Sequence, residues 1–309
     1  MSALALLFPD LALIALGWLL ARRAWLPASF WDGAEALVYW VLFPGLLFGS
    51  ICRASLALDQ AAPLVAAAYA ALATGVALSY AAPRLLGCDP RQFASAAQCG
   101  FRFNSYITLS VAARVGEAPG LALAALIVGF IVPLANMAAV YPLARQGGGS
   151  VWKALARNPL VLATVGGLAA QTLGLRMPEP VDATLMRLGQ GALALGLLCV
   201  GASLRLGGAG PADPILARSA RRLAGWLTAA KLVAMPAMAF AAARLLGLDS
   251  LSAVIVVLFA AVPTSPAASV LASRMGGDGP FAARLITLST LTAAVSLPIW
   301  IALAQAHWR

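Results

Sequence analysis

The sequence AVPTSP, residues 261–266, lies inside an apolar segment, residues 250–273, that is long enough for one membrane helix. Pro263 and Pro266 lack a backbone donor and clash with the preceding turn, so we expect the helix to break here. At the depth of a bilayer, unpaired backbone groups are tolerated only where they line a cavity or meet nearby polar groups. Three hydroxyl side chains can supply such partners: Thr264, Ser265 and Ser269.

The whole chain is strongly apolar. Of its 309 residues, 62% are hydrophobic and 10% are charged, and the mean hydropathy is +0.89. Soluble domains are nearer half apolar and a quarter charged, so we predict an all-α polytopic membrane protein. The formal net charge is +10, but the basic residues stand singly or in pairs between apolar runs. That pattern indicates membrane-protein loops and argues against binding of nucleic acid.

Ten segments are long and apolar enough to cross a bilayer, which takes about 20 residues. They are residues 4–21, 31–52, 61–83, 92–115, 120–144, 158–175, 183–204, 220–246, 250–273 and 281–305. Ten spans place both termini on one side, and the loops of the other side carry about twice as many basic residues. We therefore expect extracytoplasmic termini and a single integral transport domain, residues 1–309, in the inner (plasma) membrane of the cell.

The two halves of the chain resemble each other. At one fixed offset, LLGCD at residues 85–89 matches LLGLD at residues 245–249, and Ser105 matches Ser265. Five spans per half is an odd number, so the second half enters the membrane from the opposite side, as in the inverted repeats of secondary transporters. We predict three parts: repeat 1 over about residues 1–145, a short cytoplasmic linker over 146–157, and repeat 2 over about 158–309.

The offset aligns the broken ninth span with the fourth, where GFRFNSYITL occupies residues 100–109. Arg102 is costly inside a bilayer, and such a residue usually marks a substrate pathway. Asn104 and Ser105 can unwind the backbone through local side-chain hydrogen bonds, so we expect this helix to break as well. Interrupted helices in corresponding positions of two inverted halves are the best pointer to a substrate site.

The candidate substrate-binding residues are Arg102, Asn104, Ser105, Thr264, Ser265 and Lys231, where Lys231 belongs to the eighth span. Arg102 can hold a carboxylate with two parallel hydrogen bonds, or it can tie down the carbonyl groups of a broken helix. Asn104 can bind substrate or cap the half-helix. Lys231 can attract anions, take part in proton coupling, or neutralise the carbonyl ends of the half-helices. Asn136 and Ser269 are further candidates for the lining of the site.

The remaining chemistry is limited. All eleven acidic residues are predicted in loops or near the ends of spans, so we expect no carboxylate at mid-membrane depth to carry a cation. The basic and neutral polar side chains at that depth suit an anion. Four cysteines without CxxC spacing and a single histidine indicate neither a metal site nor a disulfide framework. No cofactor is indicated, and the sequence shows no pairing of a nucleophile with a general base, as an enzyme would require.

Four short motifs resemble the auxin efflux carrier family, in the family's order along the chain. They are VLFPGLLF at residues 41–48, similar to an LPALLF-like ending of the second span, FRFN at 101–104, similar to FRSN, NPL at 158–160, and KLVAMP at 231–236. The resemblance implies ten helices in two inverted repeats, with helices 4 and 9 broken and crossing. It also implies a scaffold of spans 1, 2, 6 and 7, often dimeric, beside a moving part made of the other spans.

Plant members of that family export auxin, and bacterial relatives are commonly labelled malonate or malate carriers. The resemblance, here to a bacterial member, therefore implies alternating-access transport of small organic anions, with lipid as surroundings and a homodimer as the assembly. The driving force could be protons, sodium ions or the membrane potential. The alternative is a sodium-coupled symporter of the same broad architecture, for bile-acid-like or other organic anions. A membrane-embedded enzyme is a rival from another class, but the sequence has no His/Asp/Glu/Cys cluster to support it. An ion channel is a further alternative, which single-channel currents would reveal.

Overall fold

The structure is a computed structural model, and it describes residues 3–53, 58–144, 159–175, 177–204 and 214–308. In these ranges the chain forms helices and connecting turns, without a strand. The linker predicted at residues 146–157 lies outside the described residues.

The described helices follow one another in a simple order. They are α1 (Ala3–Arg22), α2 (Ala28–Leu37), α3 (Phe43–Arg53), α4 (Leu58–Leu86), α5 (Pro90–Ala96), α6 (Ser105–Ala144), α8 (Pro159–Thr172), α9 (Glu179–Ser203), α10 (Pro214–Ala229), α11 (Met235–Leu245), α12 (Ser250–Ala261), α13 (Ala267–Arg274) and α14 (Gly279–His307). The π-helical turns η1 (Val38–Leu42) and η3 (Ala230–Ala234) join α2 to α3 and α10 to α11, and the 3₁₀ turn η2 (Ala97–Gly100) follows α5.

Several helices of the structure are long and apolar enough to cross a membrane. By length and composition, 6 stretches of the described residues can cross a membrane: Ala28–Arg53, Ala61–Leu86, Pro90–Pro142, Glu179–Ser203, Leu216–Leu245 and Gly279–His307. The stretch Pro90–Pro142 contains the fourth predicted segment and most of the fifth. The backbone leaves helical geometry between these two segments, at Gly116 and Glu117. Helix occupies part of every predicted segment, as expected of a multi-pass membrane protein.

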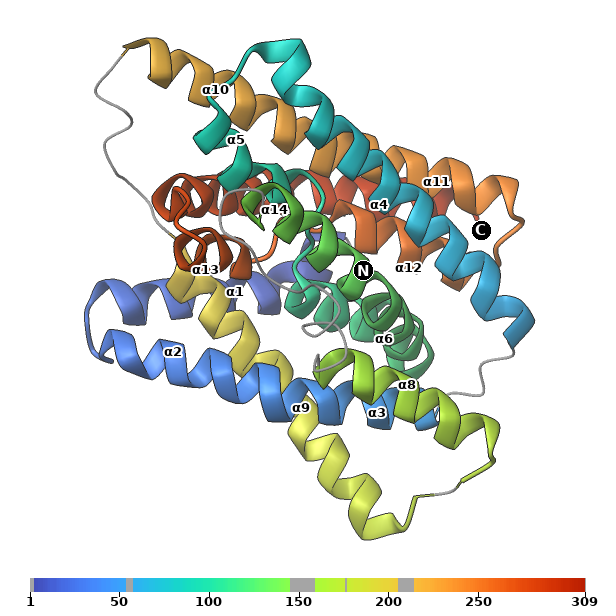
Figure 1. Cartoon of the computed structure of the whole chain (residues 1–309). Helices are drawn as coiled ribbons and strands as arrows, with labels where there is room; N and C mark the ends of the chain where they lie inside the picture. Colours follow the sequence, from blue (N-terminus) through green and yellow to red (C-terminus); the bar gives the residue numbers. More distant parts are fainter. Residues whose placement is uncertain (1–2, 54–57, 145–158, 176, 205–213, 309) are drawn as a thin grey trace.

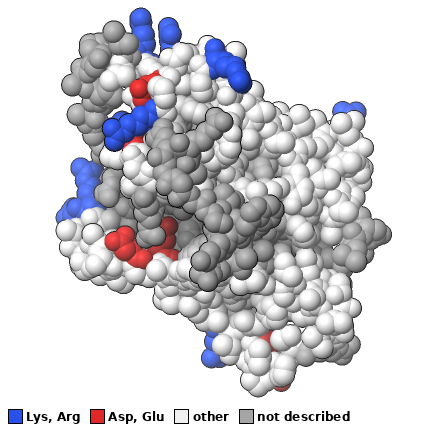
Figure 2. All heavy atoms as spheres, in the orientation of Figure 1, with Lys and Arg blue, Asp and Glu red and all other residues white. Residues whose placement is uncertain are grey.

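Charged side chains are sparse on the outer surface. In the view of Figure 2, Lys and Arg side chains lie mainly toward the left and top edges, near the start of α10. The broad face on the right is almost entirely free of charge in the part of the chain that the structure describes. An uncharged face of this kind suits contact with lipid acyl chains.

The helices pack in two groups. One group contains α1, α3, α8 and α9, in the lower part of Figure 1, and these helices correspond to predicted spans 1, 2, 6 and 7. The other contains α4, α11, α12, α13 and α14, which correspond to predicted spans on both sides of the chain midpoint. The long helix α6 packs on α12 and α4 of the second group and also reaches α3 and α8 of the first.

Glycines allow α1 and α9 of the first group to approach closely. A Cβ atom at Gly201 of α9 would overlap the backbone of Ile14 and Trp18 in α1. A Cβ atom at Gly17 of α1 would likewise overlap the backbone of Leu198 in α9. These backbones are in contact with no side chain between them, so α1 and α9 pack closely along this stretch.

We expect Gly201→Ala to lower the melting temperature of the purified protein, because overpacking of this kind costs about 1–3 kcal/mol. Gly225→Ala in α10 is the matched control, since a Cβ atom there meets nothing within 4 Å. Alanine favours a helix over glycine by roughly 0.5–1 kcal/mol, so the control should melt at the same temperature or higher. Thermal unfolding in detergent measures both, and equal shifts would contradict the close packing of α1 on α9.

Candidate functional site

Two interrupted helices meet near the centre of the molecule. Helix α12 ends at Ala261, and α13 begins at Ala267 after a non-helical stretch that contains Pro263. The first half contains a similar interruption between Gly100, the last residue of η2, and Ser105, the first residue of α6. The backbone N–H of Asn104 donates a hydrogen bond of 2.9 Å to the carbonyl oxygen of Pro263, so the two interruptions are in direct contact.

Asn104 explains why the first interruption needs no proline. Its Oδ1 atom accepts hydrogen bonds from the backbone N–H groups of Tyr106 at 3.0 Å and Ile107 at 3.2 Å. Its carbonyl oxygen accepts from the backbone N–H of Thr108 at 3.0 Å and from the Thr108 hydroxyl at 2.9 Å. Asparagine is among the preferred N-cap residues. Asn104 therefore starts α6, and of the two predicted roles the capping role is the one these contacts display.

Unpaired polar atoms remain at the crossing. Asn104 and Thr264 are both fully buried, at 0% exposure. The Nδ2 atom of Asn104 has no hydrogen-bond partner within the described residues, and the Oγ1 atom of Thr264 meets only the weakly bonding thiol of Cys99. The Thr264 backbone N–H donates to Ser289 Oγ at 3.3 Å. Buried polar atoms without a partner are rare and cost about 1–3 kcal/mol each. A ligand bound at the crossing would supply what these two atoms lack.

Arg102 lies between η2 and α6, and its guanidinium is held by neutral groups. Its Nη1 atom donates to Gln98 Oε1 and its Nη2 atom donates to Asn136 Oδ1, each at 2.8 Å. The structure thus brings Asn136, a predicted lining residue, to Arg102. Neither amide cancels the positive charge, and a guanidinium has more N–H donors than these two bonds use. The side chain is thus held in place, and these two bonds leave some of its N–H groups over.

Gln98 is a site residue that the sequence prediction missed. Besides its bond to Arg102, it donates from Nε2 to the carbonyl oxygens of Ala268 at 3.0 Å and Ser95 at 3.3 Å. It thereby links the guanidinium of one broken helix to α13 of the other. A signal was present, because Gln98 is a polar residue one helical turn before Arg102 in the same apolar segment. Ser289 gave no such signal, since isolated hydroxyls are common in membrane helices.

Lys231 in η3 is fully buried, and its Nζ atom donates to the carbonyl oxygen of Ala260 at 2.5 Å. Ala260 lies in the last turn of α12, where a helix carries partial negative charge. Of the three predicted roles of Lys231, this contact fits neutralisation of a half-helix end. The π-helical turn around it is supported by Trp300, whose Nε1 atom donates to the carbonyl oxygen of Leu232 at 2.9 Å.

The three predicted serines have different surroundings. Ser105 begins α6 and Ser265 lies in the interruption before α13, and both are partly exposed. Ser269 donates from its hydroxyl to the carbonyl oxygen of Pro266 at 3.0 Å, so it satisfies the first turn of α13. Pro266 itself has helical backbone angles and precedes α13 directly. The helix therefore breaks around Pro263, and Pro266 starts the second half-helix.

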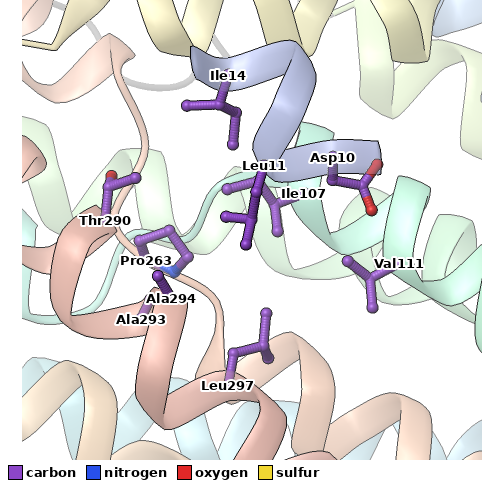
Figure 3. Close-up of a pocket in the computed structure, with 10 residues that line it drawn as sticks. All are labelled: Asp10, Leu11, Ile14, Ile107, Val111, Pro263, Thr290, Ala293, Ala294 and Leu297. Carbon is purple, nitrogen blue, oxygen red and sulfur yellow. The ribbon is translucent and has the colours of Figure 1, made fainter. Parts of the chain in front are cut away.

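A narrow pocket runs beside the crossing (Figure 3). It is lined by Asp10, Leu11 and Ile14 of α1, Ile107 and Val111 of α6, Pro263, and Thr290, Ala293, Ala294 and Leu297 of α14. Most of this lining is aliphatic. The pocket therefore lies between α1 of the first group, α14 of the second group, α6, and the interruption at Pro263.

Asp10 corrects one sequence prediction. The eleven acidic residues were all expected in loops or near span ends, but Asp10 is 2% exposed and lies two helical turns inside α1. The reason is a partner far along the chain: Asp10 pairs with Arg114 of α6, with Nε and Oδ2 3.2 Å apart. Reading α1 alone gives no indication of that partner. A buried carboxylate is thus present beside the pocket.

Comparison with known proteins identifies the family of this chain. A family model described as a membrane transport protein, the auxin efflux carrier domain, matches residues 141–301, which is just over half of the chain. The chain belongs to the auxin efflux carrier family. The match includes the second broken helix and Lys231 of this carrier, whereas Arg102 and Asn104 lie before it. The comparison with curated proteins gives no match. Transporter membership agrees with the prediction that the carrier is not an enzyme.

Proposed function

We propose that this carrier is a secondary transporter of small organic anions, and that the anion binds where the two broken helices cross. The unpaired Nδ2 atom of Asn104 carries the proposal, since it is a fully buried donor with no acceptor among the described residues. The guanidinium of Arg102 and the hydroxyl of Thr264 add further donors. A carboxylate offers two acceptor oxygens and a negative charge, and it complements this donor-rich set.

Alternating access is the mechanism that this arrangement supports. We propose ten spans in two inverted repeats, inserted in the plasma membrane with extracytoplasmic termini. The group that contains α1, α3, α8 and α9 would stay fixed and form the contact of a homodimer, as the family resemblance implies, while the broken helices move with the bound anion. The interruptions suit this role because capping and neutralising contacts stabilise each half-helix without filling the crossing.

The sodium-coupled alternative receives less support. Sodium requires several oxygen ligands, and two of the oxygens at the crossing are already engaged. Oδ1 of Asn104 accepts two backbone N–H groups, and the Ala260 carbonyl oxygen accepts the ammonium of Lys231. A lysine at the end of a half-helix supplies the positive charge that a bound cation would otherwise bring.

A thermal-shift screen of the purified protein tests the proposal. Malonate, malate and an auxin-like monocarboxylate form the panel, and the uncharged amide of each acid is its matched control. A ligand present at 100 times its Kd stabilises the folded state by about 2.7 kcal/mol, so a bound acid should raise the melting temperature by several degrees while its amide should not. Equal shifts from acid and amide would contradict the anion site, and a shift that needs sodium would favour the symporter.

A further inference from the structure

The buried carboxylate of Asp10 joins the two helix groups. Asp10 Oδ1 accepts from the hydroxyl of Ser110 at 2.5 Å and from Arg114 Nη2 at 3.3 Å, in addition to the ion pair through Oδ2. Both partners lie in the part of α6 that follows the interruption at Asn104. Every one of these contacts therefore connects α1 of the first group to the broken helix that carries the candidate site. Figure 3 shows the Asp10 side chain turned toward α6.

The two sides of this contact are supported differently. Helix α1 is fixed to α9 by the glycine contacts at Gly17 and Gly201. Toward α6 and α14 it packs less extensively, and the pocket beside Pro263 opens within that looser joint. Leu11 and Ile14 line the pocket from α1, and Ile107 lines it from α6. Separation of α1 from α6 would widen the pocket along its whole length.

We propose that the Asp10–Arg114 pair is a latch: it holds α1 against α6 and so keeps the pocket beside Pro263 closed. Arg114 lies just before the non-helical residues Gly116 and Glu117, where α6 turns back into the next predicted span. The latch thus acts at the end of the half-helix remote from Asn104, on the side of the membrane where that turn lies. Release of the pair would open a path from that side to Pro263. The role of this pair as a transport gate rests on the proposed function. The opening of the pocket on release of the pair does not.

The charges make such a latch reversible. The Asp10 side chain is 3% exposed but that of Arg114 is 33% exposed, so Arg114 can leave the pair without becoming a buried, unpaired charge. A pair buried on both sides would be costly to open, because each charge would then lie unpaired in an apolar surrounding. The partial exposure of Arg114 lowers that cost on one side, and the Ser110 hydroxyl still donates to Asp10 on the other.

Thiol labelling tests the latch without any substrate. Val111 lines the pocket and is 0% exposed, so Val111→Cys should react very slowly with a small maleimide in the otherwise native protein. We expect Asp10→Asn in that background to raise the labelling rate of Cys at position 111 at least tenfold. Arg114→Gln should give a similar increase, and the two changes together should add little, because each alone removes the same pair.

The chain supplies its own controls. Arg53→Gln breaks the ion pair between Arg53 of α3 and Asp182 of α9, which are 2.5 Å apart within the first group, and it should leave the labelling rate unchanged. Cys88 is buried in a separate cluster with residues of α10 and α14, so mass spectrometry can report its labelling in the same sample. An unchanged rate at position 111, or an equal rise at Cys88, would overturn the latch. Failure of every carboxylate to bind would instead contradict the proposed function and leave the labelling result standing.

Discussion

Arg102→Ala is expected to lower the initial rate of carboxylate uptake into proteoliposomes roughly a hundredfold or more. Hydrogen bonds to a charged group contribute about 1.5–3 kcal/mol each, and a guanidinium can give a carboxylate two of them. Arg102→Lys keeps the charge but loses the planar fork, so its rate should lie between those of Arg102→Ala and the wild type. The two substitutions together separate the contribution of charge from that of geometry.

Arg244→Ala is the control for this experiment, since Arg244 is an exposed arginine in the last turn of α11. Its uptake rate should equal that of the wild type. Arg102→Ala also leaves Gln98 Oε1 and Asn136 Oδ1 without their donor, so a modest fall in melting temperature is expected. Uptake at the wild-type rate, together with that lower melting temperature, would mean that Arg102 only supports the broken helix.

Local chemistry made the interruptions predictable from the sequence. Two prolines three residues apart remove backbone donors wherever the helix lies, and an arginine with an asparagine in an apolar segment has few structural explanations. Asn104 caps the helix that follows it with its own side chain. Such effects involve neighbouring residues, and the sequence displays them directly. The bond from Asn104 to Pro263 was only implied by the repeat, because it depends on how two distant segments pack.

The pairing of distant residues could not be predicted from the sequence. Asp10 was predicted near the end of a span because it lies in the first half of its predicted segment, residues 4–21. Its partners Ser110 and Arg114 belong to another helix and reach it only through the packing of α1 on α6. Gln98 was overlooked for a related reason, since its contact with Ala268 joins the two halves of the chain. Polar residues in apolar segments indicate that partners exist and leave their identity undetermined.

Asn104→Asp is expected to abolish anion uptake while the protein keeps a melting temperature close to that of the wild type. Aspartate and asparagine are similar as N-cap residues, so the carboxylate can accept the same backbone N–H groups of Tyr106 and Ile107, and the positive end of α6 favours its charge. The change removes the Nδ2 donor and adds a negative charge that repels an anionic substrate. Uptake rates and thermal unfolding, measured on the same preparation, test both halves of this expectation.

Asn104→Ala divides the two roles of the residue in another way. It removes the cap as well as the donor, and loss of an N-cap costs about 1 kcal/mol, so both uptake and melting temperature should fall. Thr108→Val is the matched control, because the Thr108 hydroxyl and backbone N–H both donate to the same Asn104 carbonyl oxygen and the hydroxyl is therefore redundant. Its uptake should stay near the wild-type rate. If Asn104→Asp also transported normally, the unpaired amide would have no part in binding, and the crossing would lose its strongest claim to be the substrate site.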